Sequence, residues 1–535
     1  MTTGDTGSSS LEVRRRRAWH AAWPSAVALT IDYPRVPAWW LLERSATSFG
    51  SRIAVRELDY ATGAEGRITT YEALYRAARG TATGLQALGM MRGTRIGLVL
   101  PNSRTLIVGY YATWLAGGVV VPANPAAREG EIEIHLADAD VGLVVGEAGS
   151  AAEVVARRLG RSFLDTHAFE TLATRSPIAR PFGDTDDLAV LLYTGGTTGP
   201  SKGVMLTHRN LVTNCIQFAE WYAFAPGEET CVATLPMFHS GGMSGAMNVP
   251  LHAGATLLVF GRFQAAAVAR AVTRHRATRL FGVPAMYIAL LRNDEGRRAD
   301  YSFLRACRTN AAPLPSAVKL AFDNLVGRNV LIEGYGLTEA SPLTHANPIT
   351  RARLGSIGIP LPDTDARIVD LQTGEECPTG KPGELLIRGP QVMSGYWRRP
   401  AETVAALENG WLRTGDVAAM DRDGYFAIVS RTKDVINTAG FKVWPREVEE
   451  VLFSHPAVRM AAVVGVPDSY RGETVKACVV LKDEYRRQVT ESDLRRYCRE
   501  RLTPYKVPRI VEFCDELPMT VTGKVLRHEL HKRMG

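Results

Sequence analysis

Hydrophobic and polar positions alternate in two rhythms up to about residue 355 of the chain. The first is a helical spacing of apolar residues that follows Thr70 and comprises Leu74, Ala77, Ala78, Leu85 and Leu88. The second consists of short, continuous apolar runs at residues 95–100, 119–122, 141–145, 188–193 and 255–260. Helix and strand patterns that alternate at this spacing predict a layered α/β fold with buried parallel strands.

The pattern changes after about residue 355. Short strands separated by turns dominate there, for example at residues 383–388 and 423–429, and they predict a small β-rich lobe. A last unit begins near Lys433. It shows a helix, two strands and a second helix, at residues 443–453, 461–466, 475–481 and 492–502.

These patterns predict three parts of the chain. Residues 1–20 form a flexible tail, and residues 21–432 form a large domain of two layered α/β lobes plus a small β-barrel-like lobe. Residues 433–535 form a small α+β domain. The length agrees, because a single hydrophobic core stops growing at about 250–300 residues and the chain has 535.

The most apolar stretch, residues 106–121, contains three glycines and one threonine, namely Gly109, Thr113, Gly117 and Gly118. A buried helix that runs into a core strand explains it better than a membrane span. The N-terminus has no apolar region after its charged residues, which include the basic run Arg14–Arg17, so we expect no signal peptide. The seven cysteines are odd in number and no pair has C-x-x-C spacing, so we expect neither a zinc site nor a disulfide framework. A reducing cytoplasm is the compartment that fits free cysteines.

Composition excludes several classes of protein. With 46% hydrophobic and 22% charged residues, the chain is not intrinsically disordered. The net charge of +8 suits an enzyme that handles anionic substrates. Since no long basic stripe with interleaved aromatic residues is present, we expect no nucleic-acid partner.

The segment Tyr193–Val204, which reads YTGGTTGPSKGV, has the chemistry of a phosphate-binding loop. Its glycines are Gly195, Gly196 and Gly199, and its hydroxyl-bearing residues are Thr194, Thr197, Thr198 and Ser201. Glycines allow the backbone to approach a polyphosphate and expose N–H donors, and Lys202 supplies a mobile cation. The spacing is not that of a Walker A loop, because Ser201 precedes the lysine.

This segment resembles the signature loop of the adenylate-forming superfamily, which includes acyl-CoA synthetases, aryl-CoA ligases, luciferases and adenylation domains. The resemblance extends over about residues 20–535, and later motifs recur in the expected order. Glu333 and the following Gly334-Tyr335-Gly336-Leu337-Thr338-Glu339 resemble the second nucleotide motif. An aromatic ring can stack on adenine, a threonine hydroxyl can reach the α-phosphate, and a carboxylate can hold Mg²⁺, so Glu339 is the expected metal ligand.

Two more segments complete the expected nucleotide site. The run 411–416 resembles the ribose-binding motif, in which the Asp416 carboxylate would accept from both ribose hydroxyls. Arg431 occupies the position of a second ribose contact. Ser430 stands where the family commonly has glycine. This difference affects the expected geometry of the loop and not the expected role of Arg431.

The run 517–527 resembles the last family motif and contains Lys524. Negative charge builds on the phosphorus during adenylation, so a cation held there lowers the barrier. In the family, the small last domain rotates between an adenylating and a thioester-forming pose. The resemblance implies a pivot at Lys433 and a pantetheine-facing surface that includes Gly440, Phe441 and Lys442.

The run Leu235–Met243 resembles the acid-site motif, with His239 at the position that gates the carboxylate. Amino-acid-activating relatives usually have an aspartate nearby for the substrate ammonium, and none is present here. An unpaired buried ammonium is costly, which disfavours an amino-acid substrate. The other expected pocket positions are Val283, Asn310, Ala311, Ala312, Gly336 and Pro342.

Most of these pocket positions are small or apolar, which suits an aliphatic or aryl carboxylate. Asn310 departs from relatives that have glycine there. It either shortens the pocket, bonds a polar substrate group, or caps the backbone. The T-G-G-T-T-G loop and the lead-in 31–37 resemble medium- and long-chain fatty-acyl-CoA ligases.

The resemblance therefore implies an AMP-forming acyl-CoA ligase that uses ATP, Mg²⁺ and coenzyme A. A fatty acid is the first candidate for the acid substrate. The alternative is a stand-alone enzyme that loads an acyl or aryl acid onto the phosphopantetheine of a carrier protein. A nucleotide-binding sensor without catalysis is a hypothesis of another class, which the presence of Lys202, Glu339 and Lys524 opposes. The sequence leaves open whether the protein forms a homodimer.

Overall fold

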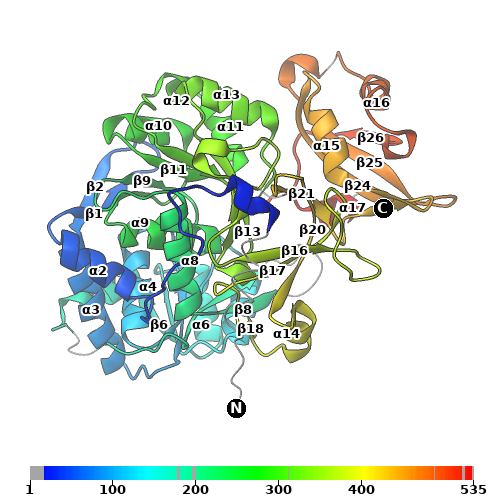
Figure 1. The fold of residues 1–535 in the computed structure, drawn as a ribbon. Helices are drawn as coiled ribbons and strands as arrows, with labels where there is room; N and C mark the ends of the chain where they lie inside the picture. The colour runs from blue at the N-terminus through cyan, green and yellow to red at the C-terminus, as the bar shows by residue number, and fades with distance from the viewer. Residues whose placement is uncertain are drawn as a thin grey trace.

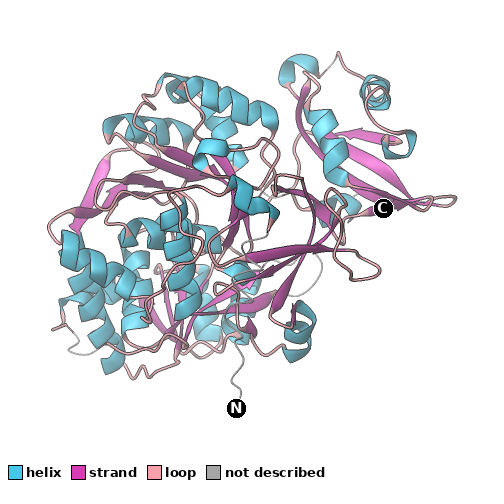
Figure 2. Cartoon of the chain, in the orientation of Figure 1, coloured by secondary structure: helices cyan, strands magenta, loops and turns pink. Residues whose placement is uncertain are grey.

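The computed structural model describes residues 17–177, 181–194, 201–310, 312–486, 488–520 and 525–532. A large N-terminal part carries the colours from blue to yellow in Figure 1, and a small C-terminal domain, orange to red, lies beside it. Helices surround the strands of the large part, as Figure 2 shows. The mixed α/β class with a small second domain, predicted from the sequence, is confirmed.

Two large sheets build the N-terminal part. The first contains nine strands, in the order β15 (Ile359–Pro360), β14 (Leu343–Ala346), β13 (Leu331–Gly336), β12 (Ala306–Thr309), β11 (Arg279–Gly282), β9 (Thr230–Ala233), β10 (Thr256–Phe260), β1 (Ile53–Leu58) and β2 (Glu65–Thr70). Its centre, from β13 to β1, is parallel, and its edges are antiparallel. Parallel strands are buried on both faces, which explains their continuous apolar runs.

The second sheet contains seven strands, in the order β18 (Gly395–Tyr396), β8 (Lys202–Thr207), β7 (Leu188–Thr194), β4 (Val119–Pro122), β3 (Arg95–Val99), β5 (Leu143–Gly146) and β6 (Ser162–Asp165). Four of the predicted apolar runs form strands of this sheet. β8 turns back on β7 as an antiparallel hairpin, and the short β18 adds to the outer edge of β8.

Helices cover these sheets: α2 (Trp40–Phe49), α3 (Tyr71–Ala87), α4 (Arg104–Leu115), α5 (Glu129–Asp138), α6 (Ala151–Arg158), α7 (Thr166–Thr171), α8 (His208–Trp221), α9 (Val249–His252), α10 (Ala265–Arg274), α11 (Pro284–Arg292), α12 (Asp294–Arg298) and α13 (Ser316–Val326). The Thr70 hydroxyl caps α3 by accepting from the Ala73 N–H at 3.3 Å. Every residue of α4 is buried, and β4 follows it, as predicted for the most apolar stretch. No helix among the described residues is long and apolar enough to cross a membrane.

A small antiparallel lobe follows. It contains β16 (Asp365–Val369), β17 (Gly383–Arg388), β19 (Leu407–Glu408), β20 (Trp411–Met420) and β21 (Phe426–Arg431), with α14 (Pro400–Ala406) at its side. β21 starts three residues after the predicted position, because the Asp421 carboxylate accepts from the N–H groups of Asp423 and Tyr425 and holds a turn there. Trp19, within the predicted tail, is buried and packs on Phe426 at 5.7 Å between ring centroids.

The C-terminal domain contains the predicted helix, strands and helix: α15 (Pro445–Phe453), β24 (Val458–Asp468), β25 (Gly472–Leu481) and α16 (Glu491–Arg499). The structure adds β22 (Ile436–Thr438), β23 (Phe441–Val443), β26 (Ile510–Phe513) and α17 (Arg527–Lys532). The domain has a core of its own, which includes Val448, Leu452, Val463, Ala477 and Leu494. The boundary near Lys433 stays a prediction; this residue lies between β21 and β22.

Arg446 on α15 connects the C-terminal domain to the large part. Its Nη1 donates to the carbonyl of Ile428 on β21 at 2.9 Å, and its Nη2 lies 3.8 Å from the Glu333 carboxylate on β13. The guanidinium is nearly buried, at 12% side-chain exposure. The two parts therefore meet through a charged contact beside the edge where β13 ends.

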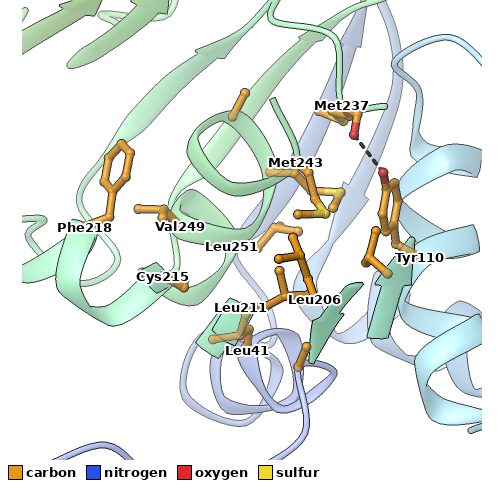
Figure 3. Close-up of a cluster of buried hydrophobic side chains, with 14 of the residues drawn as sticks. Leu41, Tyr110, Leu206, Leu211, Cys215, Phe218, Met237, Met243, Val249 and Leu251 are labelled. Atoms are coloured by element: carbon orange, nitrogen blue, oxygen red, sulfur yellow. Dashed lines mark hydrogen bonds between the residues drawn. The ribbon is translucent and has the colours of Figure 1, made fainter. Parts of the chain in front are cut away.

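A buried cluster between the two large sheets fixes the segment around His239 (Figure 3). The Tyr110 hydroxyl on α4 donates to the Met237 carbonyl at 2.8 Å. Figure 3 shows Met243 beside this contact and Leu251 between it and α8, which contributes Cys215 and Phe218 to the cluster. The chain that leads to His239 is thus held by apolar packing and by a hydrogen bond from a tyrosine side chain to its backbone.

Candidate active site

The β7–β8 hairpin carries the predicted phosphate loop. Thr194 at the end of β7 pairs with Lys202 at the start of β8, and the Ser201 hydroxyl donates to the Thr194 carbonyl at 2.7 Å. The predicted loop residues Gly195, Gly196, Thr197, Thr198 and Gly199 lie outside the described residues. Both ends of the loop are therefore defined, and they lie side by side.

Glu339 and Lys202 are brought together by a residue that the sequence did not reveal. The Tyr396 hydroxyl on β18 donates to the Glu339 carboxylate at 2.9 Å. The Lys202 Nζ lies 5.1 Å from the centroid of the same ring. Burial and the neighbouring Glu339 charge raise the pKa of Tyr396 well above its ordinary value, so the phenol stays a donor. A two-residue strand leaves no pattern that could have predicted this contact.

Tyr335, Asp416 and Arg431 form a second constellation. The Tyr335 hydroxyl donates to Asp416 Oδ2 at 2.6 Å, and Arg431 Nε lies 3.2 Å from Asp416 Oδ1. Asp416 and Arg431 are paired residues on neighbouring strands, β20 and β21. Burial, together with the Asp416 charge, raises the pKa of Tyr335 well above its ordinary value. The structure thus joins two predicted motifs that lie far apart in the sequence.

His239, Thr338 and Asn310 approach one region from three segments. Ser240, next to His239, has its hydroxyl oxygen 3.3 Å from that of Thr338. A Cβ at Gly241 would lie 3.5 Å from Asn310 Nδ2 and 3.7 Å from His239 Nδ1. The His239 side chain is exposed. The predicted gating residue, the predicted phosphate-contacting threonine and the unusual asparagine are therefore neighbours.

The other predicted acid-pocket positions surround this region to different extents. Val283 and Pro342 are buried, Ala312 is partly exposed, and Ala311 lies outside the described residues. A Cβ at Gly336 would lie only 1.9 Å from the Pro342 carbonyl oxygen. Position 336 therefore requires glycine for steric reasons, whatever its relation to the acid.

Glu333 is buried at the end of the parallel sheet. Burial raises the pKa of its carboxyl group to about 7, and Arg446 acts in the opposite direction. The Leu314 N–H donates to this carboxylate at 3.4 Å. An acidic side chain that titrates near neutral pH thus lies where the C-terminal domain meets the site.

The predicted residues of the C-terminal domain lie on its surface. Lys433, Gly440, Phe441 and Lys442 are exposed, and the Phe441 ring stacks on Tyr505 at 4.7 Å. Lys524 lies outside the described residues. On either side of it, Met519 and Val525 form a β-bridge, and the Leu526 N–H donates to the Pro518 carbonyl at 2.8 Å.

The donor set suits Mg²⁺ bound with a nucleotide and not a site made by protein alone. Among the described residues, no group of three or more His, Cys, Asp or Glu side chains could hold a metal ion. Mg²⁺ usually keeps several waters and takes one or two carboxylates plus substrate phosphates. One carboxylate beside the phosphate loop, that of Glu339, fits this mode.

Comparisons with known proteins agree with this arrangement of lobes and motifs. The family model described as "AMP-binding enzyme" matches residues 42–397, and "AMP-binding enzyme C-terminal domain" matches residues 447–524. The chain therefore belongs to the family of AMP-binding enzymes.

Three relatives illustrate the similarity. A long-chain-fatty-acid–CoA ligase of Bacillus subtilis is 36% identical, with 97% of this chain and 98% of that protein covered. A feruloyl-CoA synthase of Amycolatopsis is 38% identical over 88% of this chain and 95% of its own length. The crystal structure of ATP-bound MatB from Rhodopseudomonas palustris matches with a TM-score of 0.85 and 30% identity, covering 93% of this chain and 99% of that one.

Proposed function

We propose that the protein is an AMP-forming acyl-CoA ligase. In the first half-reaction, a carboxylate oxygen attacks the α-phosphorus of ATP, which gives an acyl-adenylate and pyrophosphate. In the second, the thiol of coenzyme A attacks the acyl carbon, which gives the acyl-CoA thioester, AMP and a proton. The observation that carries the proposal is the pair of tyrosine–carboxylate contacts, Tyr335–Asp416 and Tyr396–Glu339, the second of which lies beside Lys202 at the base of the phosphate loop.

In this proposal, different residues bind the ribose, the adenine and the phosphates of the nucleotide. Asp416 accepts from the ribose hydroxyls, Arg431 orients its carboxylate, and the Tyr335 ring stacks on adenine. Lys202 and the loop 195–200 bind the phosphates, and the Thr338 hydroxyl reaches the α-phosphate. Glu339, oriented by the Tyr396 hydroxyl, would hold Mg²⁺, which neutralises phosphate charge when bound.

Acid and thiol reach the site from different sides in the proposed cycle. His239 gates the acid, and Lys524 stabilises the charge that develops during adenylation. The C-terminal domain then turns about Lys433, so that Gly440, Phe441 and Lys442 face the pantetheine arm. The exposed position of these residues leaves them available for a new contact.

The acid is a fatty acid in the first version of the proposal, supported by the relative named a long-chain-fatty-acid–CoA ligase. The relative named a feruloyl-CoA synthase supports an aryl acid as the second candidate. A carrier-protein phosphopantetheine is the alternative acceptor, because it presents the same thiol arm as coenzyme A. We further propose a cytoplasmic location and a homodimer; light scattering tests the dimer against the chain mass of 58.4 kDa.

The experiment follows both products with a panel of acids. Purified protein, ATP and Mg²⁺ are incubated with each acid, with and without coenzyme A, and AMP, pyrophosphate and acyl-CoA are measured by mass spectrometry. We expect acyl-CoA and AMP in equal amounts for at least one acid. Acyl transfer to carrier proteins with no acyl-CoA formed would favour the alternative. No acid-dependent pyrophosphate from any acid would contradict the proposal and favour a nucleotide-binding sensor.

A further inference from the structure

Arg308 on β12 is a buried cation without a counter-ion. Arg308 is only 3% exposed, and no described residue forms an ion pair with its side chain. Its Nε and Nη2 have no hydrogen-bond partner among the described residues. The guanidinium lies over the Phe218 ring at 4.6 Å. Since arginine stays protonated in proteins, this charge is present and poorly solvated.

Arg279 on the neighbouring strand β11 shows how the same fold satisfies a buried arginine. It is 2% exposed and also lies 4.6 Å over an aromatic ring, that of Phe224. Its Nη2 reaches Glu229 at 2.7 Å, and its two Nη groups donate to the carbonyls of Tyr222 and Ala223. Within the described part of the chain, the Arg279 Nε has no hydrogen-bond partner, as at Arg308, so the contrast lies in the paired carboxylate and in the Nη2 group, which is bonded in Arg279 and without a partner in Arg308.

Three segments place Arg308 behind the predicted acid site. It lies on β12 and precedes Asn310, the first residue after that strand, by two positions. A Cβ at Gly334, two residues before Gly336 on β13, would lie 3.2 Å from the Arg308 Nε. A Cβ at Gly245 would lie 3.6 Å from its Nη1, four residues beyond Gly241. Residues two apart on a strand, or four apart on a helix, share a face. Two residues of extended chain measure roughly 7 Å, so the Arg308 backbone lies about that far from Asn310, away from the carboxyl end of β12.

A second donor accompanies Arg308. The Tyr222 hydroxyl at the end of α8 is fully buried and has no hydrogen-bond partner among the described residues. The Tyr222 ring lies 5.1 Å from that of Phe218, the ring over which the Arg308 guanidinium lies. Arg308 therefore offers a cation beside Gly245 and Gly334. Tyr222 offers an O–H close to Phe218. A plain alkyl chain would leave both unsatisfied, at a free-energy cost to binding.

We propose that Arg308 is a specificity-determining residue that binds a hydrogen-bond-accepting group, a second carboxylate in the strongest case, at the far end of the acid. The substrate class is then a carboxylic acid with a polar or anionic distal end, such as a dicarboxylic acid. This inference rests on the proposed function and narrows it. It predicts that the enzyme differs in acid preference from a ligase for unsubstituted long-chain fatty acids.

The test compares acids in matched pairs. Acid-dependent pyrophosphate release is measured for monocarboxylic and α,ω-dicarboxylic acids of equal chain length, and for cinnamate and ferulate, which differ by distal oxygen atoms. We expect kcat/KM of the wild type to favour the polar-ended member of at least one pair about 30-fold, the effect of one charge-assisted hydrogen bond. Arg308→Met should abolish that ratio chiefly through KM, and Arg308→Lys should restore part of it.

Arg305→Met is the matched control, because Arg305 is half-exposed directly before the same strand and pairs with Glu228 and Glu229. It should keep the wild-type ratio. A wild type that prefers the unsubstituted acid in every pair overturns the inference even if Arg308→Met fails to fold. An unchanged ratio in a folded Arg308→Met enzyme overturns it too. In both cases pyrophosphate release persists, so the failure differs from that of the proposed function.

Discussion

At the scale of single residues, two phenols orient two carboxylates. Tyr335 donates to Asp416 and Tyr396 donates to Glu339, both at hydrogen-bond distance. A carboxylate that accepts a hydrogen bond from a buried donor loses rotamer freedom before the ligand arrives. Because folding has already fixed the orientation of the carboxylate, less side-chain entropy is lost when the ligand binds.

Tyr396→Phe isolates the effect of one hydroxyl. The ring that faces Lys202 remains, and only the donor to Glu339 is lost. We expect KM for Mg²⁺-bound ATP to rise about tenfold or more, because a hydrogen bond to a charged group contributes a net ~1.5–3 kcal/mol. Steady-state kinetics at varied Mg²⁺ would measure it.

Tyr75→Phe provides the control for Tyr396→Phe. The Tyr75 hydroxyl also donates to a carboxylate, that of Glu43 at 2.8 Å, but the pair joins α2 and α3 away from the site. The KM of Tyr75→Phe for Mg²⁺-bound ATP should stay at the wild-type value. Equal changes in both variants would show that the Tyr396 hydroxyl contributes only to stability.

Glu333 predicts a pH-dependent stability. Its pKa is raised to about 7 from the ordinary 4.5, mainly by burial. The folded state therefore holds a proton that the unfolded state has released, and stability falls as pH rises from about 4.5 to 7. Glu333→Gln should remove this loss, with a gain of up to about 3 kcal/mol at pH 8 and little change at pH 4.5.

Thermal midpoints of the wild type and Glu333→Gln across this pH range would test the assignment. The groups that act on Glu333 are Arg446, the Leu314 N–H, Glu450 and Lys319. Glu408→Gln, at an exposed position, is the control and should follow the wild-type curve. A Glu333→Gln midpoint that stays below that of the wild type at pH 8 would contradict the prediction.

At the scale of elements, regular periodicity was the reliable signal. The helix after Thr70 follows from helical spacing, and the buried strands follow from continuous apolar runs, because both faces of the strands are covered. The strands β18, β22 and β23 are two or three residues long, and no periodicity can develop over that length. Tyr396, Arg446 and Arg308 escaped prediction for a related reason: their partners come from distant elements.

Arg446→Leu should loosen the contact between α15 and the large part. The substitution removes the hydrogen bond to the Ile428 carbonyl and the charge beside Glu333. We expect trypsin to cleave at Arg431 and Lys433 roughly tenfold faster, because a charged hydrogen bond contributes about 1.5 kcal/mol or more. Mass spectrometry of timed digests would identify the sites.

Arg501→Leu is the matched control for Arg446→Leu. Arg501 bonds to Tyr497 and Glu500, so its contacts stay inside the C-terminal domain. Its digestion rate should equal that of the wild type. Identical rates for all three proteins would mean that Arg446 does not hold the two parts together.

At the scale of the whole molecule, the chain folds as a large N-terminal part and a small C-terminal domain. The motif order allowed this division to be predicted, together with the constellation around Asp416 and the phosphate loop. The identity of the acid could not be predicted, because the pocket is assembled from three segments whose side-chain packing no linear pattern encodes. The two-pose cycle remains a prediction.

Lys524→Ala tests that cycle. The lysine is expected to serve adenylation only, so the variant should lose adenylation by several orders of magnitude and keep thioester formation from supplied acyl-adenylate. Measuring the two half-reactions separately decides it. Lys482→Ala, in the same domain, is the control and should retain both. Equal loss of both half-reactions in Lys524→Ala would contradict the two-pose assignment.

The bridge between Met519 and Val525 has a kinetic consequence. Met519 and Val525, on either side of Lys524, belong to one domain. In the proposed role of Lys524, its effective concentration at the phosphates would be set by the orientation of the entire C-terminal domain. Rotational diffusion of that domain then limits how often the charge arrives, so turnover should fall as solvent viscosity rises wherever this step controls the rate.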